Sequence, residues 1–213
     1  IVFEFSANPT RLKAKGTKGQ TVCTLEGSTD GGSTWNTIWS TEDAVGQLKT
    51  GTVADFPSAI GTANISIPVP ADMQKDGVLF SFHYVLPKYS TTGSIVFIDN
   101  LKLQADKSSS GGGEESTLLD ENFDDCITSG YSGNIPSDWT QAKKNSGIYT
   151  WRTYKTSDHI TAYCTNDSTS QSDGWGGDEE WSAGQDEYLI TPELDLSGKT
   201  ANMTFQFSAN RVN

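Results

Sequence analysis

Apolar and polar side chains alternate along much of the chain, and the same alternating stretch occurs near both ends. Residues 3–8 read FEFSAN and residues 205–210 read FQFSAN, a pattern typical of half-buried β-strands. Five of the six positions are identical, which two unrelated segments would rarely share. We therefore expect the chain to run from the middle of one repeated domain to the middle of its next copy.

Further strands are predicted along the first half. Residues 21–26 and 36–39 flank an Asp-Gly-Gly turn, which is a strong hairpin signal because glycine takes the positive φ angles of tight turns. This turn also fits the Asp-box pattern, S-x-D-x-G-x-x-W, whose Asp and Trp act on turn geometry and packing. Other predicted strands are 64–69, 78–85 and 94–103, with a loop at 41–62. No helical period is convincing, so the predicted class is all-β.

A Ser/Gly-rich segment divides the chain. Residues 106–117, with SSSGGGEE at their centre, have the composition of a flexible linker. We expect residues 1–105 to be the back half of one repeat and residues 118–213 the front half of the next. Within the latter, the predicted strands are 118–125, 149–154, 160–163 and 187–192, with a long polar loop at 165–185.

Motifs in both halves resemble one known domain family. The second half contains LLDENFDD and DEYLITPELDLSG, and the first half contains STDGGSTW and SIVFIDNLKL. In this order they are similar to the cleaved-adhesin and choice-of-anchor J domains, found in the haemagglutinin/adhesin regions of gingipains and in surface proteins of Bacteroidetes. The resemblance covers nearly the whole chain apart from the linker.

The resemblance has implications for fold and role. It implies a jelly-roll β-sandwich related to galactose-binding and MAM domains, commonly with structural calcium. It implies adhesion or carbohydrate binding rather than catalysis, in a secreted or cell-surface protein. One departure concerns Asn100, where the family often has a second acid.

Charge narrows the possible partners. The 213 residues carry a net charge of −12. Residues 1–105 contribute 8 − 9 = −1, and residues 106–213 contribute 7 − 18 = −11. This balance argues against nucleic acid as a partner and leaves carboxylates for a cation or for a solvated acidic surface. No apolar run is long enough to span a bilayer, so membrane insertion is not expected.

The acidic residues at the start of the second half suggest a calcium site. Calcium prefers six to eight oxygen ligands, and the segment LLDENFDD supplies several carboxylates. In related jelly rolls the opening strand lies beside the closing strand, which would bring Asp99 towards Glu121. We predict a structural Ca²⁺ bound by Glu121, Asp124 and Asp99; the alternative is an acidic surface without a metal.

Tryptophans provide the candidate ligand platform. Trp175 and Trp181 lie among Ser, Gly, Asp and Glu, where an indole is hard to bury. An aromatic face beside carboxylates suits a sugar ring, so we predict that both are partly exposed and bind a glycan or a host surface protein. The alternative is that they pack down to pin a long loop. The remaining tryptophans lie in or beside strand patterns and are predicted to be core: Trp35, Trp39, Trp139 and Trp151.

Catalysis is not expected. His83 and His159 have no nucleophile near them in sequence. Paired carboxylates are plentiful, so a glycoside hydrolase is kept as a weaker alternative. The other alternative to a binding module is a purely structural spacer domain.

The cysteines show no metal-binding spacing. Cys23, Cys126 and Cys164 lack CxxC or His-associated patterns. Cys126 and Cys164 would be able to pair in an oxidising compartment; the alternative is three buried free thiols.

Two half domains must find partners, because half a jelly roll leaves strand edges and one face of its core open to water. The linker is long enough to join neighbouring strands, so the chain is expected to close on itself as a circularly permuted monomer. The rival arrangement is a domain-swapped dimer.

Overall fold

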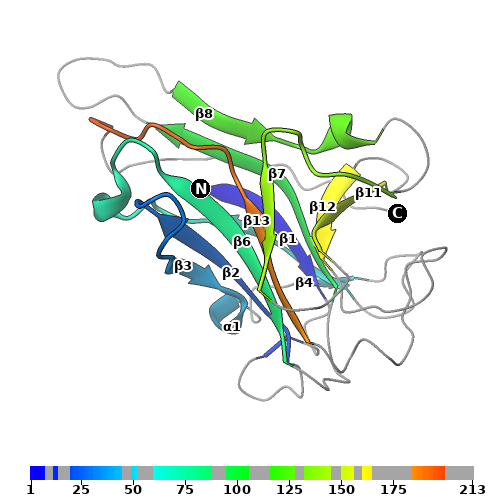
Figure 1. Cartoon of the computed structure of the whole chain (residues 1–213). Coiled ribbons are helices and arrows are strands. Elements are labelled where there is room, and N and C mark those ends of the chain that lie inside the picture. Colours follow the sequence, from blue (N-terminus) through cyan, green and yellow to red (C-terminus); the bar gives the residue numbers. More distant parts are fainter. Residues whose placement is uncertain are drawn as a thin grey trace.

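The computed structural model describes residues 1–7, 12–13, 20–44, 49–51, 60–87, 95–105, 116–127, 132–144, 150–155, 160–164 and 184–199. These ranges form two antiparallel sheets that enclose one hydrophobic core (Figure 1). The predicted all-β class and β-sandwich are confirmed, and the jelly-roll connectivity stays a prediction. Of the helices in these ranges, none is long and apolar enough to cross a membrane.

The larger sheet has eight strands in the order β4-β5-β1-β7-β12-β11-β9, and β8 also pairs with β7. Their bounds are β4 Lys49–Gly51, β5 Ile60–Ser66, β1 Val2–Ala7, β7 Val96–Ala105, β12 Ile160–Cys164, β11 Arg152–Lys155, β9 Ser132–Gly133 and β8 Ser116–Glu121.

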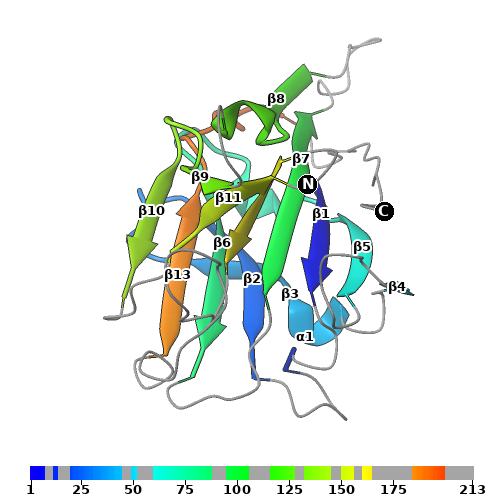
Figure 2. The ribbon, with the colours of Figure 1, turned by 90° about the vertical axis from the view of Figure 1, so that its right-hand side faces the viewer.

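The smaller sheet has five strands in the order β10-β13-β6-β2-β3, and Figure 2 shows β10, β13, β6 and β2 side by side. Their bounds are β10 Thr140–Lys143, β13 Gln185–Ile190, β6 Leu79–Leu86, β2 Val22–Ser28 and β3 Asn36–Ser40. Short helical turns complete the described elements: α1 Thr41–Ala44, η2 Ala71–Met73 and η3 Asp124–Cys126.

Strands from both predicted halves share both sheets. In the five-stranded sheet, β13 pairs with β6 from Gln185↔Leu86 to Ile190↔Ser81. In the eight-stranded sheet, β12 and β8 both pair with β7. The pairing of β8 with β7 confirms that the opening strand of the second half lies beside the closing strand of the first.

The repeated stretch is described in its first copy only. Residues 2–7 form β1, which lies between β5 and β7. The second copy, residues 205–210, lies outside the described residues, and so does the centre of the linker.

A β-bulge in β7 changes which of its residues face the core. The β1–β7 register passes from Glu4↔Asp99 to Val2↔Lys102, so β7 contains one residue more than its partner. Asn100 takes φ 49° there, a left-handed conformation that Asn tolerates better than most residues. Before the bulge the core contains Val96 and Ile98, and after it Leu101, Leu103 and Ala105.

The Asp-Gly-Gly hairpin forms between β2 and β3 as predicted. The Asp30 carboxylate accepts hydrogen bonds from the Thr34 amide (2.9 Å), the Thr34 hydroxyl (2.7 Å) and the Ser28 hydroxyl (2.8 Å). Hydrogen bonds from Thr34, and then from Ser28, lower the pKa of Asp30 to about 2. Gly31 and Gly32 supply the positive φ angles of 69° and 84°. This turn delivers Trp35 to the start of β3.

The predicted loop at 41–62 was wrong in part. It contains α1 and β4, and β5 already begins at Ile60. The Thr41 hydroxyl accepts a hydrogen bond from the Cys23 amide (3.0 Å), which ties α1 to β2. The residues Gly61 and Thr62 pair with Ala7 and Ser6, so the neighbouring strand overrides a composition typical of loops.

The tryptophan prediction holds for Trp139 and Trp151 and in part for Trp39, which is partly buried and packs against the core. Trp139 and Trp151 are buried in the core. Trp35 and Trp39 are only partly buried. They belong to the hairpin of β3, which is an edge strand of the five-stranded sheet, so no further strand covers them on one side.

Candidate functional site

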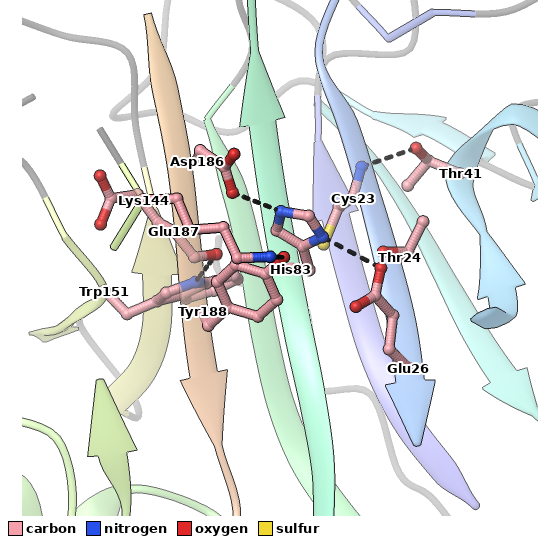
Figure 3. A network of polar contacts seen from close by, with 10 residues as sticks. All are labelled: Cys23, Thr24, Glu26, Thr41, His83, Lys144, Trp151, Asp186, Glu187 and Tyr188. Atoms are coloured by element: carbon pink, nitrogen blue, oxygen red, sulfur yellow. Dashed lines mark hydrogen bonds and ion pairs between the residues drawn. The ribbon is translucent and has the colours of Figure 1, made fainter. Parts of the chain in front are cut away.

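Polar and aromatic side chains gather on the outer face of the five-stranded sheet. Alternate residues of β6 fill the core, from Phe80 to Leu86, so His83 points the other way. On the flanking strands the same face carries side chains of β2 and β13, because His83 lies opposite Thr24 and Tyr188 in the two registers. We call this group the histidine cluster: Thr24, Glu26, His83, Lys144, Asp186 and Tyr188 (Figure 3).

His83 lies between two carboxylates from different strands. Its Nδ1 is 3.0 Å from Oε1 of Glu26, and its Nε2 is 2.8 Å from Oδ1 of Asp186 (Figure 3). A neutral imidazole has one N–H and donates to one carboxylate, whereas the imidazolium donates to both. The ring also stacks on Tyr188, with centroids 3.9 Å apart and planes 14° apart. One side chain thus connects β2, β6 and β13.

Hydrogen bonds and neighbouring charges shift the pKa values of several groups in the histidine cluster. Burial acts to raise the pKa of Glu26, but hydrogen bonds from His83 and Thr24 and the charge of His83 outweigh it, so this pKa lies below its usual range. Lys144 places Nζ 4.5 Å from the centre of the Tyr188 ring and donates to its hydroxyl. That hydrogen bond raises the pKa of Lys144. Two carboxylates, an imidazole and an ammonium group thus lie together on this face.

Directly behind the cluster, Glu187 points into the sandwich. Its side chain is fully buried, and burial raises its pKa to about 7 from 4.5, although Lys143 and Thr150 act in the opposite direction. Its backbone carbonyl accepts a hydrogen bond from Nε1 of Trp151 (3.2 Å, Figure 3). Because the folded-state pKa is raised, the stabilisation from protonated Glu187 is complete below pH 4.5 and is lost as the pH rises through about 7.

The geometry of the cluster suits binding better than proton transfer. Both ring nitrogens of His83 face carboxylates, so neither is placed to take a proton from a hydroxyl or thiol nucleophile. The imidazole also fills the space between Glu26 and Asp186, where a glycosidase would hold the scissile bond. The side chains that remain available for hydrogen bonding from the outer side of the sheet are the partly exposed His83 and Asp186 and the exposed Lys144.

Sequence reasoning did not find this cluster. The one signal was the presence of Ser81 and His83 in an otherwise apolar strand. Their partners come from β2 and β13, and no local pattern indicates that those strands flank β6. The predicted ligand residues Trp175 and Trp181, together with His159, lie outside the described residues, and the platform stays a prediction.

The predicted calcium ligands each use an oxygen to accept a backbone hydrogen bond. Asp99 accepts from the Asn100 amide (2.7 Å), Glu121 from the Phe123 amide (2.6 Å) and Asp124 from the Ile160 amide (3.2 Å). Within the described ranges no three His, Cys, Asp or Glu side chains form a group that would hold a metal ion. The calcium site therefore stays a prediction.

None of the three cysteines forms a disulfide bond in this structure. Cys23 and Cys164 are buried, and Cys126 is half-buried. Burial, followed by the charge of Glu121, raises the pKa of Cys126 to about 11. Burial also raises the pKa of Cys23, so these two thiols are poor nucleophiles.

Comparisons with models of protein families, with curated proteins and with solved structures found no match for this chain.

Replacing His83 by Phe tests the cluster. The ring would still stack on Tyr188, but Glu26, with 11% of its side chain exposed, would lose its hydrogen-bond partner His83. We expect the free energy of unfolding to fall by about 2–4 kcal/mol, measured by urea denaturation. Adding Glu26→Gln to this variant should restore part of the loss, because it removes the unpaired charge.

The matched control for this prediction is Lys102→Met, which breaks an exposed ion pair with Asp120 on the other sheet (3.0 Å). It should cost less than ~1 kcal/mol. A His83→Phe variant as stable as this control would contradict the account of the cluster.

Proposed function

We propose that this chain is a non-catalytic binding module of a secreted or cell-surface protein and that it binds a glycan or a host surface protein. The observation that carries the proposal is the outer face of the five-stranded sheet, where the partly exposed indole of Trp35 lies 6.1 Å from the buried ring of Tyr188, which belongs to the histidine cluster. Aromatic rings stack on the C–H faces of sugars, and neighbouring polar groups exchange hydrogen bonds with their hydroxyls.

Charge supports the same choice of partner. The chain is strongly acidic, which disfavours nucleic acid. Within the cluster the charges pair internally, so a neutral partner is favoured over an ion. The resemblance to cleaved-adhesin domains adds the expectation of a bacterial surface protein that acts by adhesion.

A spacer role is the second candidate, and one observation favours it. The polar groups of His83, Glu26 and Asp186 pair with one another, as they would in a face that only needs to stay ordered. A spacer would bind no sugar at millimolar concentration, whereas an adhesin would.

The predicted platform in the loop gives the binding test. A glycan array should identify at least one bound oligosaccharide, and titration should then give its affinity. Replacing Trp175 or Trp181 by Ala should weaken binding by ~1–3 kcal/mol if each indole stacks on the ligand, by analogy with bases on aromatic side chains. The control variants Trp175→Phe and Trp181→Phe retain a ring and should retain most of the affinity. An array without any bound glycan would argue for the spacer.

Calcium is a separate part of the proposal, supported by crowded carboxylates. Burial, and then the charges of Asp138, Asp125 and Asp120, raises the pKa of Glu121, and a bound cation would relieve this repulsion. We expect EGTA to lower the melting temperature of the protein. The Glu121→Gln variant should lose this sensitivity, and Glu193→Gln, at an exposed position, should keep it. Identical melting curves with and without EGTA would count against the metal.

A further inference from the structure

The place of β1 in the larger sheet is set by main-chain pairing on both of its sides. β1 lies antiparallel to β5 on one side and to β7 on the other. At its start, the Ile67 amide donates a hydrogen bond to the Ile1 carbonyl (2.7 Å), and the Ile1 nitrogen donates to the Ile67 carbonyl. In the core this segment contributes Ile1 and Ala7. Because ladder hydrogen bonds join backbone groups, a second segment with the same pattern of apolar positions fits the same place.

The repeated stretch near the other end of the chain has this pattern. When the two copies are aligned, Met203 corresponds to Ile1 and Ala209 corresponds to Ala7. The two residues of β1 lie in the core, and their counterparts are apolar as well. The one difference within the repeat replaces a Glu by a Gln, at the position that pairs with the exposed Asn64 of β5. The second copy therefore matches β1 position by position.

The chain after β13 leads towards this place along the same partner segment. β13 runs antiparallel to β6, and beyond the two strands Leu194 exchanges two hydrogen bonds with Val78 (2.9 and 3.0 Å). The Leu196 amide then donates to the Lys75 carbonyl (2.8 Å). The second part of the chain thus runs in the opposite direction along the segment that connects β5 to β6.

The remaining interval has the length that is needed to reach the place of β1. From Leu196 to Met203 there are 203 − 196 = 7 residues, and from Ile67, the partner of Ile1, to Lys75 there are 75 − 67 = 8. Seven extended residues reach up to about 23 Å. The eight residues on the partner side include the turn η2, which rises only about 2 Å per residue, so the two intervals are similar in length. Continuing the same antiparallel course therefore brings Met203 opposite Ile67.

We propose that the place between β5 and β7 is a strand-binding site for both copies of the repeat, in which residues 203–209 replace residues 1–7 of the same chain. The exchange breaks the ladder hydrogen bonds of one copy and forms the equivalent set with the other, so no backbone group of β5 or β7 is left unpaired. The partner is a segment of the chain itself, and the inference does not depend on the proposed binding function.

Proline substitutions at matched positions test the exchange. Phe5 pairs with Ala63 on β5 and with Ile98 on β7, and a proline between two strands removes a ladder hydrogen bond. Phe5→Pro should keep a cooperative urea transition close to that of the parent protein, because the second copy takes the place of the first. Phe207→Pro, at the matching position, should keep it because the first copy stays.

The variant with both prolines should unfold at clearly lower urea concentration or show no cooperative transition, because neither copy then fits between β5 and β7. A Phe5→Pro variant as unstable as this double variant would overturn the inference.

A designed disulfide locates the second copy directly. Glu4 pairs with Asn64, and the aligned residue of the second copy is Gln206. This pair is of the non-hydrogen-bonded kind, whose Cα atoms lie about 4.5 Å apart, within the range for a disulfide. Cys126, the half-buried thiol, is replaced by Ser to prevent side reactions. In that background Asn64→Cys with Gln206→Cys should cross-link within one chain, quickly with Phe5→Pro and slowly with β1 intact.

The control is Asn64→Cys with Glu4→Cys, which should cross-link with β1 intact and lose most of its yield with Phe5→Pro. Mass spectrometry of non-reduced digests identifies each bond, and a denaturing gel separates bonds within a chain from bonds between chains. Absence of the bond between positions 64 and 206 in both backgrounds, or its formation only between two chains, would overturn the inference.

Discussion

The structure depends on two strand pairings that join the two parts of the chain, β13 with β6 and β12 with β7. Residues 1–105 supply β2, β3 and β6 of the smaller sheet, and residues 116–199 supply β10 and β13. Without β13, β6 would have an open edge and the core would lose Leu189. Neither part buries its own core, so the fold requires both to meet.

The histidine cluster lies at this junction and also fixes its register. Glu26 and His83 come from the first part, and Asp186 and Tyr188 come from the second. A shift of β13 by one residue against β6 would turn Asp186 into the core and Glu187 out of it. A partly buried ion cluster is weak evidence for stability in itself. The cluster matters more for register, because only one alignment of the two parts places both carboxylates within hydrogen-bond distance of His83.

Local sequence patterns predicted the local parts of this fold. The hairpin around Asp30 follows from turn chemistry, and the alternation in β6 and β7 follows from burial on one side. The position of β8 beside β7 followed from the resemblance to jelly rolls. Strand β4 and the start of β5 were missed because Gly61 and Thr62 are ordered by pairing with β1 rather than by their own preference.

The candidate site was beyond sequence reasoning for a related reason. Ser81 and His83 are polar residues in an otherwise apolar strand. The cluster around His83, however, forms only with Glu26 and Asp186, which are 57 and 103 residues away from His83 in the chain. Such long-range neighbours are set by the order of strands in the sheet. The core position of Trp151 could be predicted from its strand pattern, whereas the partial exposure of Trp35 and Trp39 depends on β3 being an edge strand.

The central claim is that the two parts pair within one chain and so build the cluster between them. Light scattering at micromolar protein concentration tests it most directly, because intramolecular pairing and exchange between chains differ twofold in mass. The account predicts a single species of 23.0 kDa. A stable dimer of twice that mass, in which residues 1–105 of one copy pack on residues 118–213 of another, would contradict it.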